Sequence, residues 1–305
     1  MKFHKGLLDI FILSMLWGPS FLFVKLAVGS IDPLTLVALR ISLGALLLYT
    51  VMWFRGIRLK GHYKLIPHCL FLGVFAQSLP FICFNYSLQT IPSSLSALIN
   101  GSTPVLTILL ANLFIKDEKL SWNRVIGILM GLSGFFVLFL PPLLGKNDHG
   151  LHLPGMLLSF IGASCYAIGM VYARVFLKNS PPLVVPMLQL LTSLIYLIPL
   201  ALIVESPLDT LPHAPLKVWL SVLGLGLLGT MLAYIMYYRI IAKQGATAVS
   251  MVAYLLPIVG TLFGVIFLKE HIGIHFCIAA ALILCGVLVV NGVFAKAKKK
   301  EVVIN

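Results

Sequence analysis

The strongest constraint in this sequence is a succession of apolar runs, each about 20 residues long and separated by short polar segments. A helix rises about 1.5 Å per residue, so a run of this length crosses the roughly 30 Å hydrocarbon layer of a membrane. Only 10% of the residues are charged, against about a quarter in soluble chains. The sequence therefore predicts an all-α integral membrane protein with ten transmembrane helices. The predicted spans are 7–27, 33–53, 65–87, 93–115, 122–141, 154–176, 183–203, 216–240, 246–268 and 273–294.

The basic residues orient these spans. The net charge is +13, but the Lys and Arg residues lie in the short gaps between apolar runs, which argues against a nucleic-acid partner. With the N-terminus in the cytoplasm, 17 of the 22 Lys and Arg fall in cytoplasmic segments and four on the other side. The first run lacks a signal-peptidase site, so we expect it to be retained as a span. The predicted location is the cytoplasmic (inner) membrane, with both termini cytoplasmic.

The two halves of the chain resemble each other. The segment DPLTLVALR (32–40) resembles PPLVVPMLQ (181–189) at an offset of 149 residues. Pro104 and the run to Glu118 resemble Pro257 and the run to Glu270, with the offset drifting from 153 to 152. Two repeats of five spans must have opposite orientations, because five is odd. Such inverted repeats place a substrate site near the membrane midplane. We expect a first repeat at 1–145, a second at 150–295 and a basic cytoplasmic tail at 296–305.

The motifs of the first half also resemble a known family. Trp17-Gly18, Pro33, Arg40, the Asn100 to Pro104 stretch and Glu118 resemble the EamA-type repeat of the drug/metabolite transporter superfamily. The second half departs from it, with Tyr166 in place of Trp and Gln189 in place of Arg. The resemblance implies two inverted five-helix repeats around a central cavity. It also implies a carrier of amino acids, nucleotide-like metabolites, sugar phosphates or drugs.

Polar residues recur at helical spacing on two spans. Residues three and four apart share a helix face. Span four carries Ser93, Ser96, Asn100, Thr103 and Thr107, and span nine carries Thr247, Ser250, Tyr254, Pro257 and Thr261. These stripes either line a cavity or hold helices together through small and hydroxyl side chains. The candidate substrate-binding residues are Trp17, Lys25, Arg40, Gln77, Asn100, Thr103, Tyr166, Gln189, Tyr234 and Tyr254.

Arg40 is the sharpest single feature. It lies seven residues into span two, about 10 Å from Pro33 along the helix. A permanent cation at that depth costs several kcal/mol unless it is hydrated or paired. No Asp, Glu or His lies in the middle of any predicted span. Arg40 is therefore either solvated by water, carbonyls and hydroxyls for structural reasons, or bound to an anionic group of the substrate.

These features favour a secondary transporter of a small organic metabolite, such as an amino acid or an anionic relative, over two alternatives. An intramembrane enzyme needs acid–base groups or metal ligands at membrane depth, and a channel-like facilitator needs a charge ring or filter. The sequence Gly224 to Gly229 satisfies GxGxxG but follows no strand, so it predicts no dinucleotide site. We expect no cofactor and no metal. The expected partners are a small-molecule substrate and the lipid bilayer, in a monomer or a homodimer.

Overall fold

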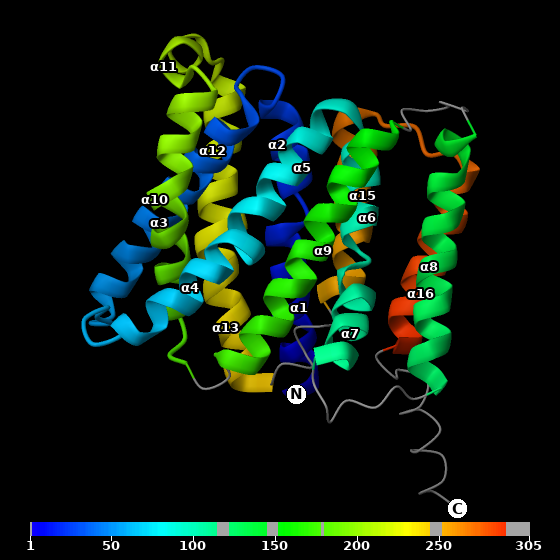
Figure 1. Ribbon diagram of the computed structural model, residues 1–305, viewed down its shortest axis with the longest axis horizontal. Coiled ribbons are helices and arrows are strands. Elements are labelled where there is room, and N and C mark those ends of the chain that lie inside the picture. Colours follow the sequence, from blue (N-terminus) through cyan, green and yellow to red (C-terminus); the bar gives the residue numbers. More distant parts are fainter. Residues whose placement is uncertain (1, 115–121, 145–151, 178–179, 245–251, 291–305) are drawn as a thin grey trace, which may run out of the picture.

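The computed structural model describes residues 2–114, 122–144, 152–177, 180–244 and 252–290, and this part of the chain is helical with no strand (Figure 1). Several spans consist of two to four consecutive helical pieces. The elements of the first half are α1 (Lys2–Trp17), α2 (Ser20–Ala27), α3 (Pro33–Phe54), η1 (Tyr63–Leu65), α4 (Ile66–Gly73), η2 (Val74–Ser78), α5 (Leu79–Thr90), α6 (Ser93–Asn100), α7 (Thr103–Phe114) and α8 (Trp122–Leu143). Those of the second half are α9 (Leu153–Phe176), α10 (Val184–Val204), α11 (Pro207–Thr210), η3 (Leu211–His213), α12 (Leu216–Gly226), η4 (Leu227–Leu232), α13 (Ala233–Gln244), α15 (Val252–Leu268) and α16 (Ile274–Val290).

Eight helical stretches in the described residues are long and apolar enough to cross a membrane. They are Leu8–Ala27, Pro33–Phe54, Tyr63–Thr90, Ser93–Phe114, Trp122–Leu143, Leu153–Phe176, Val184–Val204 and Leu216–Tyr237. Two shorter apolar helices, Leu255–Leu268 and Ile274–Val289, lie within the last two predicted spans. The chain is thus a multi-pass, all-helical membrane protein.

Breaks in the helices follow Pro and Gly. The first span divides into α1 and α2 at Gly18-Pro19, where Pro19 has no N–H to donate. A Cβ at Gly18 would overlap the side chain of Val259 of α15, so the missing side chain lets the two helices approach closely. The fourth span divides at Gly101, where a Cβ would likewise overlap the ring of Pro257 of α15.

The two halves interleave rather than standing apart. Helix α3 packs on α10 and α12, α5 packs on α9, and α6 packs on α15. Helices α8 and α16 form a pair at one edge of the molecule (Figure 1). A Cβ at Gly286 of α16 would lie 2.6 Å from the carbonyl oxygen of Gly127 and 2.7 Å from the nitrogen of Gly131. The GxxxG pattern of α8 therefore serves packing within one chain.

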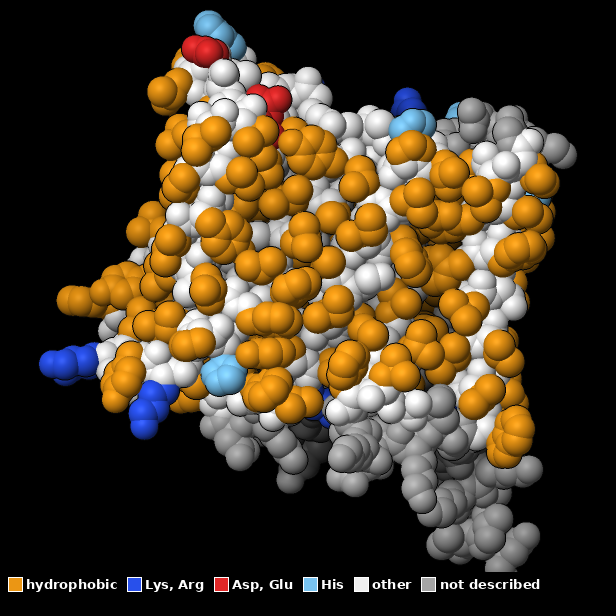
Figure 2. Space-filling model, in the orientation of Figure 1, with side chains coloured by type: hydrophobic (Ala, Val, Ile, Leu, Met, Phe, Trp, Pro, Cys, Tyr) orange, Lys and Arg blue, Asp and Glu red, His pale blue; other side chains and the backbone are white. Residues whose placement is uncertain are grey.

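Apolar side chains cover the face of the molecule in Figure 2, and charged side chains gather at its ends. Large residues such as Phe54, Trp122 and Ile203 are more than four-fifths exposed, as lipid-facing residues are. We call the end that carries residues 55–65 and 180–183 the inner end. The opposite end, with residues 28–32, 205–215 and 269–273, is the outer end (Figure 1).

Candidate functional site

Arg40 lies on α3 inside the helical bundle and is 6% exposed. Its Nε donates to Oγ1 of Thr230 at 3.3 Å, and its Nη2 donates to the carbonyl oxygen of Gly229 at 3.3 Å. The guanidinium also lies 3.8 Å from the ring centroid of Phe81 of α5, which is a cation–π contact. Both oxygen partners belong to η4, a π-helical turn, and such turns free backbone carbonyls from the regular α-helical pattern.

A second site repeats this arrangement in the other half. Gln189 of α10 donates from Nε2 to Oε1 of Gln77 at 3.1 Å and to the carbonyl oxygen of Leu72 at 3.4 Å. Gln77 lies in η2, which is also π-helical. The hydroxyl of Tyr234 donates to the same Oε1 of Gln77. The offset of 149 pairs Arg40 with Gln189, and the offset of 153 pairs Gln77 with Thr230.

Aromatic rings join the two sites. Phe81 lies one helical turn beyond Gln77 on the same span, and its ring meets that of Tyr166 of α9 edge-to-face at 6.3 Å. The hydroxyls of Tyr166 and Tyr234 both lie within electrostatic range of Arg40. We call the following residues the central cluster: Arg40, Gln77, Phe81, Tyr166, Gln189 and Tyr234.

The central cluster offers hydrogen-bond donors to a ligand. A guanidinium has five N–H groups, and the contacts above account for two of those of Arg40. The Nε2 of Gln77 is fully buried and has no partner among the described residues, and the same holds for Oγ of Ser20. No Asp or Glu of the described residues forms an ion pair with Arg40. Unmet buried donors beside a cation suit an anionic, acceptor-rich group.

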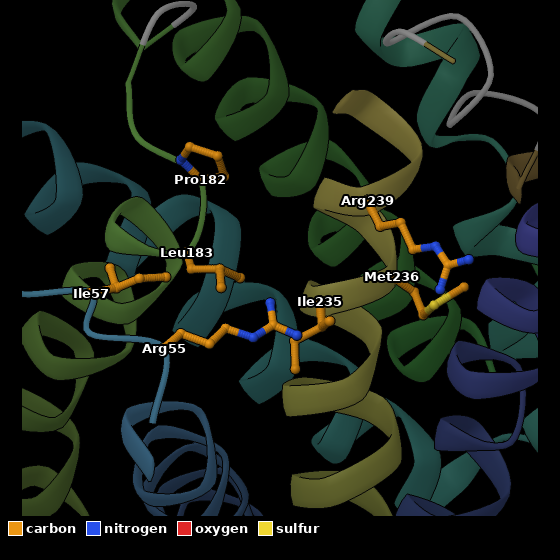
Figure 3. Close-up of a pocket in the computed structure, with 7 residues that line it drawn as sticks. All are labelled: Arg55, Ile57, Pro182, Leu183, Ile235, Met236 and Arg239. Carbon is orange, nitrogen blue, oxygen red and sulfur yellow. The ribbon is translucent and has the colours of Figure 1, made fainter. Parts of the chain in front are cut away.

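A pocket at the inner end lies between the loops that flank α3 and α10 and helix α13. It is lined by Arg55, Ile57, Pro182, Leu183, Ile235, Met236 and Arg239 and has a volume of about 360 Å³. Figure 3 shows the Arg55 side chain reaching toward Ile235 of α13, the neighbour of Tyr234. Leu183 precedes Gln189 by six residues, about 9 Å along α10. The Arg239 guanidinium forms an ion pair with Asp9 at 3.5 Å. Of the two cations that line the pocket, Arg239 is thus paired with a carboxylate.

The structure places other predicted binding residues away from the central cluster. Lys25 donates from Nζ to the carbonyl oxygens of Leu88 at 2.7 Å and Ile91 at 2.9 Å, near the outer end of α5. Trp17 packs against Tyr237 with ring centroids 5.9 Å apart. The side chain of Tyr254 lies outside the described residues, as do Thr247, Ser250 and Glu118.

The polar stripe of span four is used in helix packing. Oγ of Ser96 lies 2.8 Å from Oγ of Ser159 of α9. Thr103 donates to the carbonyl oxygen of Asn100 at 2.7 Å and to its Oδ1 at 3.3 Å, and Thr107 donates to the carbonyl oxygen of Thr103. Of these bonds, only the one between Ser96 and Ser159 joins α6 to α9, whereas those of Thr103 and Thr107 stay within their own span.

Three residues of the site were not predicted. Phe81 carries the cation–π contact, and Gly229 and Thr230 supply the oxygens that bind Arg40. The repeat offset already held a signal for Thr230, because it is the equivalent of the predicted Gln77. An apolar Phe within an apolar span carried no such signal.

Comparison with known proteins identifies the family. The profile of the EamA-like transporter family matches residues 4–140 and 153–292. The chain is 24% identical to the uncharacterized transporter YoaV of Bacillus subtilis, over 96% of this chain and 99% of the relative. It is 27% identical to the uncharacterized inner membrane transporter YedA of Escherichia coli K12, covering 84% of this chain and 80% of YedA.

Two further matches bear on the fold and on relatives with a named activity. The chain is 25% identical to a protein of Escherichia coli K12 named "Probable amino-acid metabolite efflux pump", over 95% of both. A crystal structure with 24% sequence identity has the same fold, with a TM-score of 0.66 over 94% of this chain and 97% of that chain. The family and these relatives are transporters, not enzymes. The chain belongs to the EamA-like transporter family.

Proposed function

We propose that this protein is a secondary transporter that moves a small organic metabolite with an anionic group across the inner membrane by alternating access. The observation that carries the proposal is Arg40. It is a buried cation with unused N–H donors, held on an aromatic ring and two oxygens, and no described carboxylate neutralises it. A cation held in this way is costly without a ligand and is well suited to bind a carboxylate or phosphate.

The proposed architecture has ten spans in two inverted repeats at 1–145 and 150–295, with both termini and a basic tail at 296–305 in the cytoplasm. Three observations support it. The family profile matches the chain twice, once in each half. The equivalent residues Arg40 and Gln189 each bond to a π-helical turn of the opposite half. The bulk of the basic residues falls at the inner end under this orientation.

The pocket at the inner end supports alternating access. It lies between helix α13 and the loops that flank α3 and α10, whereas the outer ends of α3 and α10 are bonded to one another, as shown below. We therefore infer that the structure is in an inward-facing conformation. Arg55 at the entrance favours approach of an anion from the cytoplasm, whereas the charge of Arg239 is paired with that of Asp9.

The substrate class follows from the cluster and from one relative. The donor-rich cluster suits a carboxylate, and the relative named as an amino-acid metabolite efflux pump suggests amino acids or related organic acids. We propose that the transported compound is of this size and class. Its driving force is a gradient or an exchange partner.

Transport into liposomes containing the purified protein tests this proposal. A screen of amino acids and organic acids should yield a substrate whose uptake saturates, because a carrier has a limited turnover. Arg40→Gln should lower the apparent affinity for it roughly tenfold to a hundredfold, since a charge-assisted contact contributes about 1.5–3 kcal/mol. Arg40→Lys should retain the charge yet lose most of the affinity, because an ammonium cannot form two parallel bonds.

Arg58→Gln is the matched control, because Arg58 is exposed in the loop that follows α3. It should leave affinity unchanged. A well-folded Arg40→Gln protein with normal affinity would show that Arg40 has only a structural role.

A further inference from the structure

Two carboxylates of the second half, at the outer end, cap the N-termini of helices of the first half. Glu270 follows α15, and Lys269 before it adopts the left-handed conformation with φ of 55°. The N–H of Glu270 donates to the carbonyl oxygen of Gly264 at 3.3 Å, so the chain after α15 bonds back to the last turns of that helix. The carboxylate of Glu270 then accepts the backbone N–H groups of Ser93 at 2.6 Å and Ser94 at 2.9 Å. Helix α6 has no capping side chain of its own.

Glu205 does the same at α3. It follows the last residue of α10, and its carboxylate accepts the backbone N–H groups of Leu34 at 2.9 Å and Thr35 at 2.7 Å. The hydroxyl of Thr35 also donates to it at 2.8 Å, and that of Tyr86 at 3.3 Å. Asp32 occupies the N-cap position of α3 but makes no capping bond. Burial and the neighbouring charge of Glu205 raise the pKa of the Asp32 carboxyl.

The equivalent junction at the inner end has no carboxylate cap. The offset of 149 pairs Leu34 with Leu183 and Glu205 with Gly56. Gly56 has no side chain that could cap a helix, and the N-terminus of α10 has no capping side chain. Leu183 lines the inner pocket together with Arg55, and its φ of 66° is a strained value for a non-glycine residue. The helix junction is therefore capped by a carboxylate at the outer end, and it is held by apolar packing without such a cap at the inner end.

We propose that Glu205 and Glu270 are the positioning residues that keep the outer end closed and make the inward-facing conformation the resting state. Each carboxylate belongs to the second half and binds the N-terminus of a helix of the first half, so both contacts must break when the halves separate at the outer end. Ionised carboxylates bind helix N-termini more strongly than neutral groups do, through charge-assisted bonds and the helix dipole. This inference rests on the alternating access proposed above, but it requires nothing of Arg40.

Distances between spin labels test the proposal without a substrate. The five native cysteines, Cys69, Cys83, Cys165, Cys277 and Cys285, are first replaced. One pair of labels, at Gly29 and Leu208, reports on the outer end, and a second pair, at Lys60 and Phe176, reports on the inner end. All four positions are exposed in the structure, and a Cβ at Gly29 has nothing within 4 Å.

Glu205→Gln and Glu270→Gln should each raise the population with a longer outer distance about tenfold, since each replaces charge-assisted bonds with weaker neutral ones. The double variant should populate it most. The inner distance should shorten in the same molecules, which local fraying of helix ends would not produce. Asp209→Asn is the control, because Asp209 is an exposed outer-end carboxylate in α11.

Unchanged outer and inner distances in a folded double variant would overturn the proposal. So would a longer outer distance with no change at the inner end, because that result is fraying alone. Neither result depends on what Arg40 binds. Loss of affinity in Arg40→Gln together with unchanged distances in the double variant would support the substrate site at Arg40. It would refute the role of Glu205 and Glu270 in keeping the outer end closed.

Discussion

The two π-helical turns are built alike but differ in charge. At η4 the partner is Arg40, and at η2 it is Gln189. The Gln189 amide is satisfied by Leu72 and Gln77, whereas Arg40 keeps unused donors. The neutral site also has an unmet donor, Nε2 of Gln77, so the two sites differ in charge more than in free donors. The difference teaches that the π-helical turn is common to both sites and that one side chain, Arg40, carries the anion binding proposed above.

The largest expected effect comes from making the two sites equal in charge. Gln189→Arg would bury a second cation near Arg40 without a carboxylate, and an uncompensated buried charge costs about 3–5 kcal/mol. We expect a large fall in the thermal unfolding midpoint of the detergent-solubilised protein. A dicarboxylate should restore more of that midpoint than a monocarboxylate does. Gln189→Leu is the control, and an equal loss in both variants would show that the amide matters and the charge does not.

The second-largest effect on stability is expected from removing the Thr230 hydroxyl, which accepts a hydrogen bond from Arg40. Thr230→Val keeps the shape but removes the oxygen that accepts from Nε of Arg40, and losing a hydrogen bond to a charged group costs about 1.5–3 kcal/mol. Thr230→Ser keeps the hydroxyl and should recover most of the stability. Thermal unfolding of the three proteins compares them. Equal midpoints for Val and Ser would mean that Thr230 only fills space.

Substituting alanine for the glycines that allow close helix approach should cost different amounts of stability at the two sites. A Cβ at Gly44 would overlap the β-branched side chain of Thr230, whereas a Cβ at Gly73 would lie 2.9 Å from Oγ1 of Thr192 and 3.0 Å from Oγ of Ser193. Overpacking costs about 1–3 kcal/mol. We expect Gly44→Ala to lower the unfolding midpoint more than Gly73→Ala, because hydroxyls can rotate away. Gly29→Ala is the neutral control, and the reverse order would contradict this account.

The smallest effect is expected at the neutral site. Tyr234→Phe removes one of the two donors to Oε1 of Gln77 while Gln189 remains. A neutral hydrogen bond contributes about 0.5–1.5 kcal/mol. Stability should fall slightly and the apparent affinity for substrate by less than in Arg40→Gln. A loss of affinity as large as that of Arg40→Gln would place the substrate contact at Tyr234 instead.

Much of the helical layout could be predicted from sequence because lipid imposes length and hydropathy on every span. The repeat offset also paired Arg40 with Gln189, and Gln77 was a candidate because it is a polar residue within the third predicted span. A π-helical turn has no hydropathy signature, so the roles of Gly229 and Thr230 could not be seen. Polar periodicity does not reveal whether a hydroxyl faces water or bonds to its own helix, as Thr103 does. Glu205 and Glu270 appear in sequence only as loop charges, since their partners are backbone N–H groups from the other half.

The glycine contact between α8 and α16 has a consequence for how the chain is assembled. Each of these helices ends one half, and Gly286 meets the backbone of Gly127 and Gly131 with no side chain between them. Ile128 and Phe135 continue the contact against Ile283 and Val287. Neither half alone can cover its own surface here. The peptide connection between α8 and α9 is therefore not what holds the halves together, and two separately synthesised polypeptides divided at that connection carry complementary surfaces through which to associate.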